Sequence, residues 1–283
     1  TLHAASQGIG PPVYAAVSWP WAPQPGDGGK QRYGLVMILA RADGDMVHYQ
    51  MALRTQYPVV SALAGPPQEL RENAELASVW LAGLCYHIAW TGHVNFDMKP
   101  GNLLMHHEQN TFFMSDFDAM YYRHFSDAAV GVRARFFINL LLLCMHVRAY
   151  STGFFATPFL APLAQVMLEL WKQAVTDPSG FGAGAVMLQT VSIESTYDRG
   201  SFDHRELRRI ADPAQRAGRQ LSMMVFEYLF DNAHGKKPVT KVTQWPAWKK
   251  TGTFVTGTPP LIPQLLQFIF FYAKPIPDAY VEV

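Results

Sequence analysis

Four polar residues of the kinds that phosphoryl transfer requires fall within one short stretch of the chain: Asp97, Lys99, Asn102 and Asp116. Asp97-Met-Lys-Pro-Gly-Asn102 sets an acid, a base and an amide at offsets of zero, two and five, and Asp116-Phe-Asp follows fourteen residues after Asn102. Phosphoryl transfer needs an acid to orient the nucleophile, a cation on the moving phosphate, and an amide plus a carboxylate to hold Mg²⁺. The stretch offers a candidate for each role.

The same residues resemble the catalytic and magnesium-binding loops of the protein kinase-like superfamily, which read H-R-D-x-K-P-x-N followed by D-F-G. The resemblance implies that Asp97 is the catalytic base and that Lys99 faces the phosphate. It also implies that Asn102 and Asp116 are metal ligands, with ATP and Mg²⁺ as the cofactors.

Three positions depart from the family pattern. Asn95 stands where the family has His, Phe96 where it often has Arg, and Asp118 where it has Gly. Phe96 removes the arginine that pairs with a phosphorylated activation loop, so we do not expect control by that phosphorylation. Asp118 lacks the backbone freedom of glycine, which argues against an in/out flip of this loop.

An apolar segment upstream extends the resemblance. Tyr33–Leu39 predicts a buried strand, and Ala40–Met46 resembles the hinge between the two kinase lobes. By that resemblance Ile38 is the gatekeeper, Leu39–Arg41 offer backbone groups to adenine, and Asp45 contacts the ribose.

The first part of a kinase small lobe has no counterpart in this sequence. That part consists of a Gly-rich loop, a strand lysine and a helix glutamate. Either these elements lie upstream on a longer precursor or the protein never had them, and the sequence leaves both open. We therefore predict a small-lobe remnant at 1–45, a helical large lobe at 46–235 and a basic, aromatic C-terminal extension at 236–283.

Two long helices are predicted in the large lobe. Glu69–Trp90 repeats apolar residues at helical spacing; the stripe comprises Leu70, Ala74, Ala77, Leu81, Leu84 and Ile88. Arg135–Tyr150 is apolar nearly all round, which indicates a buried central helix. The family's aspartate that braces the catalytic loop from this helix has Asp127 as its nearest candidate.

Composition limits the function classes. The chain is 49% hydrophobic and 16% charged, with a net charge of +1, so charge provides no strong nucleic-acid signal. Cys85 and Cys144 lie in helical apolar patterns and indicate core thiols in an intracellular, reducing compartment. We expect no signal peptide, because no basic-then-apolar leader is visible, and no transmembrane segment, because the longest apolar run, 136–145, is too short.

The C-terminal residues suggest a partner. Residues 236–250 combine five lysines with Trp245 and Trp248, a pattern of nucleic-acid binding or of an arm lying on its own domain or a partner. A short helix, Leu261–Tyr272, and an extended end would suit docking onto another protein.

These observations predict an α+β protein of protein kinase-like fold, with a reduced β small lobe and a mainly α-helical large lobe. The expected function is ATP- and Mg²⁺-dependent transfer of the γ-phosphate to a hydroxyl, with protein Ser/Thr favoured because Lys99 is the protein-kinase choice. One alternative is a pseudokinase that serves as a binding or assembly module. Another is a small-molecule kinase related to choline and aminoglycoside kinases, which the short activation segment without A-P-E also fits.

Overall fold

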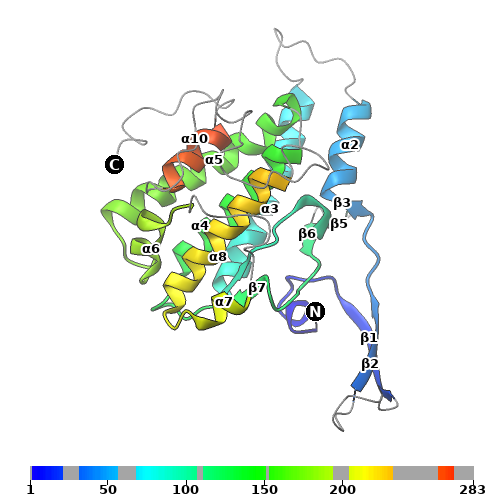
Figure 1. Cartoon of the computed structure of the whole chain (residues 1–283). Coiled ribbons are helices and arrows are strands. Elements are labelled where there is room, and N and C mark those ends of the chain that lie inside the picture. Colours follow the sequence, from blue (N-terminus) through cyan, green and yellow to red (C-terminus); the bar gives the residue numbers. More distant parts are fainter. Residues whose placement is uncertain are drawn as a thin grey trace.

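The structure is a computed structural model, and it describes residues 2–21, 32–56, 68–106, 111–150, 153–193, 204–231 and 261–270. It is a mixed α+β fold in which a helical body carries small sheets on one side (Figure 1). The helices are α1 (Leu2–Ser6), α2 (Met46–Gln56), α3 (Gln68–Trp90), α4 (Val132–Tyr150), α5 (Gly153–Thr176), α6 (Gly184–Thr190), α7 (His204–Arg209), α8 (Pro213–Asp231) and α10 (Leu261–Phe270). The strands are β1 (Val13–Trp21), β2 (Arg32–Leu39), β3 (Gly44–Asp45), β4 (His93–Asn95), β5 (Leu103–His106), β6 (Thr111–Met114) and β7 (Tyr122–His124).

The core of the body is formed by α3, α4 and α5, which pack against one another, with α8 and α10 against α4. Both predicted long helices are confirmed. The whole apolar stripe of α3 that the sequence indicates is buried, and α4 is buried on nearly every side from Phe137 to Val147. The reason is that α4 is surrounded by other helices, whereas α3 is covered on one face only.

Glycine ends α3 and directs the chain into β4. Gly92 has a φ of +89°, and its backbone nitrogen donates to Ala89 O at 3.1 Å while Thr91 N donates to His87 O at 3.0 Å. This left-handed residue just beyond the last turn is the usual way to satisfy terminal helix carbonyls. The turn leads at once into β4 and the loop that carries Asp97.

Two small antiparallel sheets flank that loop. One has the order β3-β5-β6, and the other pairs β4 with β7. The β5–β6 hairpin follows Asn102 and ends directly before Ser115. The loop of Asp97 leads into the first residue of this hairpin, Leu103, and the loop of Asp116 follows its last residue, Met114. These two residues are paired, so the two loops lie side by side at the open end of the hairpin.

The predicted strand at Tyr33–Leu39 exists as β2, but its predicted burial is wrong. Among the described strands, β1 and β2 pair only with each other. The ribbon projects from the helical body (Figure 1), and Tyr33 and Ile38 are 68% and 58% exposed. A buried strand needs a layer on each face, and the described residues supply none to this ribbon.

The C-terminal predictions are only partly covered. The helix expected at Leu261–Tyr272 is present as α10, which packs against α5, α4 and α6. Residues 236–250, with their lysines and tryptophans, lie outside the described residues, as do 271–283. None of the helices that the structure describes combines the length and apolar character needed to cross a bilayer.

Candidate active site

The side chains of the loop after β4 converge on Asp97. One carboxylate oxygen, Oδ2, accepts hydrogen bonds from Lys99 Nζ at 2.6 Å and from Asn102 Nδ2 at 2.9 Å. Asn102 Nδ2 also donates to the backbone oxygen of Asp97 at 3.1 Å. Three of the four predicted chemical residues thus form one hydrogen-bonded cluster. Charge-assisted bonds of this kind are short and orient the carboxylate.

The fourth residue, Asp116, is held beside this cluster through its neighbour. The backbone nitrogen and the hydroxyl of Ser115 both donate to the backbone oxygen of Asn102, at 2.8 and 3.1 Å. Asp116 itself is exposed and has a φ of +58°, a left-handed conformation that is uncommon for a residue with a side chain. Backbone strain of this sort is typical of functional sites.

The rest of the Asp116-Phe-Asp motif closes the loop. Asp118 Oδ1 accepts from the backbone nitrogen of Met120 at 2.7 Å, and Gln220 of α8 donates to the backbone oxygen of Met120 at 2.7 Å. Phe117 packs edge-on against Tyr122, with ring centroids 5.0 Å apart. Contacts from β7 and α8 therefore fix this loop.

A buried amide on α4 supports the Asp97 loop from below. Asn139 Oδ1 accepts from the backbone nitrogen of Asn95 at 2.9 Å, and Asn95 Oδ1 in turn accepts from the backbone nitrogen of Asp97 at 2.8 Å. Asn139 Nδ2 donates to the carbonyls of Cys85 and His93, at 3.4 Å each. One side chain therefore joins α3 to β4 and, through Asn95, to the Asp97 loop.

The expectation that Asp127 braces this loop is wrong. Its side chain is 84% exposed, and its carboxylate pairs with Arg135 Nη2 at 2.7 Å. Arg135 is buried, and its guanidinium also donates to the backbone oxygens of Ala89, Phe125 and Val130. Asp127 lies before α4 begins and pairs with Arg135, whereas Asn139 of α4 makes the contact with the Asp97 loop through Asn95.

A third polar residue of α4 lies near Lys99. His146 is buried in the core, and burial lowers the pKa of its imidazole well below the usual value, with the positive charge of Lys99 acting in the same direction. Arg135, Asn139 and His146 are four and seven residues apart, so they share one face of α4. Three polar residues on one face of the otherwise apolar run 135–147 are the sequence signal for this support.

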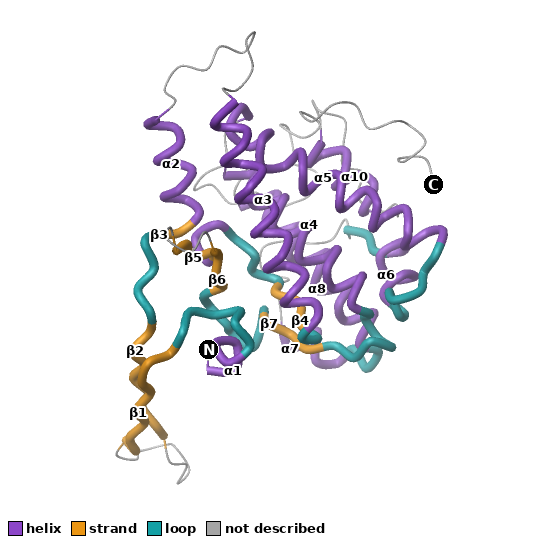
Figure 2. Tube along the Cα trace, turned by 180° about the vertical axis from the view of Figure 1, so that it is seen from behind, coloured by secondary structure: helices purple, strands orange, loops and turns teal. Residues whose placement is uncertain are grey.

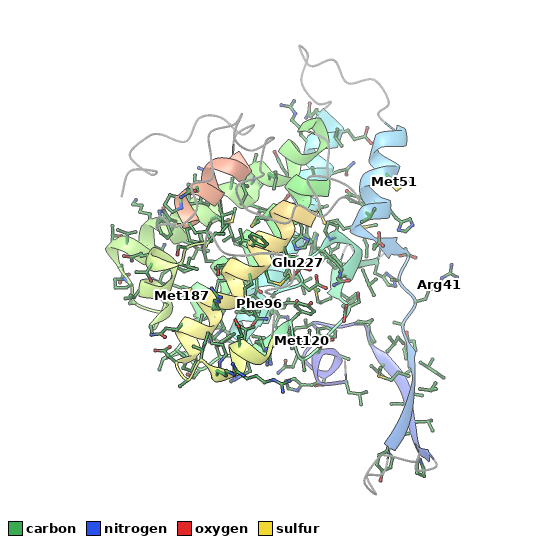
Figure 3. The ribbon with its side chains drawn as sticks, viewed as in Figure 1. Arg41, Met51, Phe96, Met120, Met187 and Glu227 are labelled. Atoms are coloured by element: carbon green, nitrogen blue, oxygen red, sulfur yellow. The ribbon has the colours of Figure 1, made fainter. Side chains whose placement is uncertain are left out.

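The residues predicted to contact the nucleotide take no part in the hydrogen bonds of the Asp97 cluster. Ile38 and Leu39 are at the end of the exposed β1–β2 ribbon, and the Arg41 side chain points away from the body (Figure 3). Asp45 ends β3 directly before α2, and its Oδ1 accepts from the backbone nitrogen of His48 at 2.9 Å. That bond is an N-cap, a structural role that leaves the ribose contact as a prediction.

The donor set suits Mg²⁺ without forming a dense metal cage. In the described part of the chain, no three His, Cys, Asp or Glu side chains gather as metal ligands. Asn102 donates through its side-chain nitrogen to Asp97, so its amide oxygen would be the ligand atom, and Asp116 presents an exposed carboxylate. Oxygen donors of this type, few in number, match Mg²⁺, which keeps several waters and binds substrate phosphates.

A pocket of about 530 Å³ lies elsewhere, between α6 and α8. It is lined by Met187, Val191, Asp212 and Arg219 among others, and by none of the predicted site residues. Its floor is close-packed: a Cβ at Gly218 would approach Met187 to 2.8 Å. This pocket is therefore separate from the Asp97 cluster.

Comparison with known proteins returns no relative. No family model, no curated protein and no solved structure matches the chain. The likeness to kinases therefore depends on the loop residues and their contacts alone.

Proposed function

We propose that this protein is an ATP- and Mg²⁺-dependent phosphotransferase of protein kinase-like type. The observation that carries the proposal is the Asp97 cluster: an acid bound by a lysine two residues on and by an amide five residues on. The cluster is joined through Ser115 to a strained, exposed aspartate. An acid, a cation, an amide and a second carboxylate are the parts that phosphoryl transfer uses.

Each side chain has a step that its position supports. Asp97 orients the attacking hydroxyl and accepts its proton, since Lys99 and Asn102 fix the rotation of its carboxylate by binding one oxygen. Lys99 is partly exposed, so its ammonium group can swing from Asp97 to the γ-phosphate. Asn102 and Asp116 would hold Mg²⁺, which when bound neutralises charge on the transferring phosphate.

The acceptor is proposed to be a protein serine or threonine hydroxyl. A lysine two positions after the base is the protein-kinase arrangement, and Lys99 adopts it with a direct contact to Asp97. A small-molecule hydroxyl is the second candidate, because the described chain between Asp118 and α4 is short. Transfer to casein-type protein substrates and to choline or aminoglycosides separates the two.

The first experiment is a thermal shift with ATP, with and without Mg²⁺, followed by transfer from γ-labelled ATP. We expect a Mg²⁺-dependent rise in melting temperature, since a ligand that binds only the folded state stabilises it, by about 2.7 kcal/mol at a hundredfold excess over Kd. Asp116→Ala should abolish the shift. Asp97→Asn should abolish transfer while the protein still folds.

Asp118→Ala is the matched control. It removes a carboxylate from the same motif, two residues from Asp116, and costs only the turn contact with Met120. The Mg²⁺-dependent shift should survive in this variant. Unchanged transfer in Asp97→Asn, or an equal loss of the shift in Asp116→Ala and Asp118→Ala, would contradict the assigned roles.

The second candidate function is a binding or assembly module without transfer activity. The observation in its favour is the exposed β1–β2 ribbon, which carries the predicted adenine contacts without a described layer over them. No thermal shift at millimolar ATP, with the protein folded, would favour this function over catalysis.

A further inference from the structure

The outward face of α3 is apolar over half its length. From Leu76 to Trp90 the exposed positions of this helix carry a single polar side chain, His87. The others are Leu76, Val79, Trp80, Gly83, Tyr86 and Trp90, and we call them the α3 stripe. The first turns of the same helix expose Gln, Glu and Arg instead. Figure 2 shows α3 running along the surface in front of α4.

Together with His87, the positions of the α3 stripe fall in pairs about Gly83, as the residues of a helix face do about its centre. Trp80 and Tyr86 lie three residues to either side, Val79 and His87 four, and Leu76 and Trp90 seven. At 100° per residue these offsets span one continuous face centred on the glycine. An antiparallel copy of the helix, related by a two-fold axis at Gly83, would set Trp80 against Tyr86 and Leu76 against Trp90.

Gly83 itself suits the crossing point of two helices. A Cβ built at this position meets no atom within 4 Å, so the packing of the chain itself does not require a glycine. Glycine in the interior of a helix costs about 1 kcal/mol relative to alanine. A second helix can approach the backbone of α3 closely at Gly83, and a side chain at this position would prevent that approach.

The two ends of the α3 stripe have features that fit this antiparallel arrangement. The ring of Tyr86 packs edge-on against Phe136, with ring centroids 5.4 Å apart. The ring centroids of Tyr86 and Trp90 are 6.2 Å apart. At the other end, a pocket of about 70 Å³ opens beside Leu76 and Trp80. The two-fold arrangement brings Trp90 of the second copy to Leu76, at the mouth of this pocket.

We propose that the α3 stripe binds a second copy of this chain as an antiparallel, two-fold helix pair that crosses at Gly83. A two-fold interface must be complementary to itself, so that residue i contacts j and j contacts i. In this arrangement the pairs Trp80–Tyr86 and Leu76–Trp90 each form twice, and Val79 meets His87. A second copy suits the stripe because the exposed rings of each copy then cover apolar residues of the other.

The size of the stripe sets the expected strength. Trp80, Tyr86 and Trp90 are 40%, 46% and 68% exposed, which amounts to roughly 350 Å² per copy from these rings alone. With Leu76 and Val79 the pair approaches the low end of specific interfaces. We therefore expect a reversible dimer that dissociates on dilution.

Sedimentation velocity over a concentration series tests the proposal. The mass should rise from 31.7 kDa toward twice that value as concentration increases. Gly83→Lys should raise the dimer dissociation constant at least tenfold, because it places two ammonium groups at the axis, while lysine forms helix better than glycine and the monomer keeps its melting temperature. Gln68→Lys adds the same charge outside the stripe and should leave the dimer intact.

Cross-linking defines the geometry independently. Cys85 and Cys144 are buried, so a short bismaleimide should join two copies of Gly83→Cys and should not join Glu72→Cys. A chain that stays monomeric to about 100 µM, a dimer that Gly83→Lys leaves unchanged, or equal cross-linking at both positions would overturn the proposal. A dimer that fails in Gly83→Lys and cross-links only at position 83 would support it.

Discussion

Asn139 on α4 accepts a 2.9 Å hydrogen bond from the backbone nitrogen of Asn95, two residues before the candidate base. Both residues are fully buried. Asn95 passes this support on, because its own side-chain oxygen binds the backbone nitrogen of Asp97. The position of the candidate base is therefore set by an amide 42 residues further along the chain.

Replacing that amide should reduce both stability and transfer. Asn139→Leu removes the partner of Asn95 N and leaves buried carbonyls of Cys85 and His93 without their donor. We expect the free energy of unfolding to fall by about 1–3 kcal/mol, measured in urea, with reduced transfer at saturating ATP. Gln173→Leu on the exposed side of α5, which breaks only a contact with Glu169, should change neither. Full transfer in Asn139→Leu would contradict the supporting role.

The buried guanidinium of Arg135 should matter much more than its acidic partner. Arg135→Met removes a charged donor from three backbone oxygens, of which Ala89 O still accepts from Gly92 N, and we expect a loss of about 3 kcal/mol or more in the free energy of unfolding. Asp127→Asn removes an ion pair whose acid is mostly exposed, and such pairs contribute about 0–1 kcal/mol. Equal destabilisation by the two variants would show that the ion pair, rather than the carbonyl contacts, holds the segment.

His93 should make the protein less stable in mild acid. Its ring stacks on Tyr122 with centroids 4.4 Å apart and meets His124 edge-on. Burial, with the charges of His124, His3 and Arg135, lowers the pKa of His93 from 6.5 to about 4. The unfolded chain therefore binds a proton below pH 6.5 that the folded chain refuses until about pH 4. Stability falls through this window, by up to about 3 kcal/mol.

Urea unfolding between pH 7 and pH 4 measures this effect. His93→Asn should flatten the dependence, leaving the part that His146, whose pKa is also lowered, contributes in the same direction. Tyr122→Phe keeps the stacked ring and removes no group that titrates in this range, since burial raises the pKa of Tyr122 to about 12. It should retain the wild-type slope. A wild-type slope in His93→Asn would contradict the assignment.

The two cysteines should be unreactive in the folded protein. Cys85 and Cys144 are free and buried, as the sequence predicts, and burial raises the pKa of both thiols. The thiolate is the reactive form, so an aromatic disulfide reagent should modify neither until the chain is unfolded in guanidinium, when both react. Rapid labelling of the native protein would show that the core opens around α3 and α4.

The local sequence determined the elements that depend on nearby residues. The stripe from Leu70 to Ile88 predicts both α3 and its buried face, because helical periodicity is a property of consecutive residues. The apolar run of α4 predicts its central place for the same reason. The sequence predicts that Asp97, Lys99 and Asn102 belong to one site, since they lie within six consecutive residues.

Only the tertiary structure decided which residues support the site and which surfaces stay open. Asn139 reaches Asn95 because α4 crosses beneath β4, and no local pattern encodes that crossing. The β2 strand has a buried-strand sequence yet lies exposed, because burial depends on layers supplied from elsewhere in the chain. The sequence contains the symmetric spacing around Gly83, but packing decided that this face of α3 remains uncovered by the described elements.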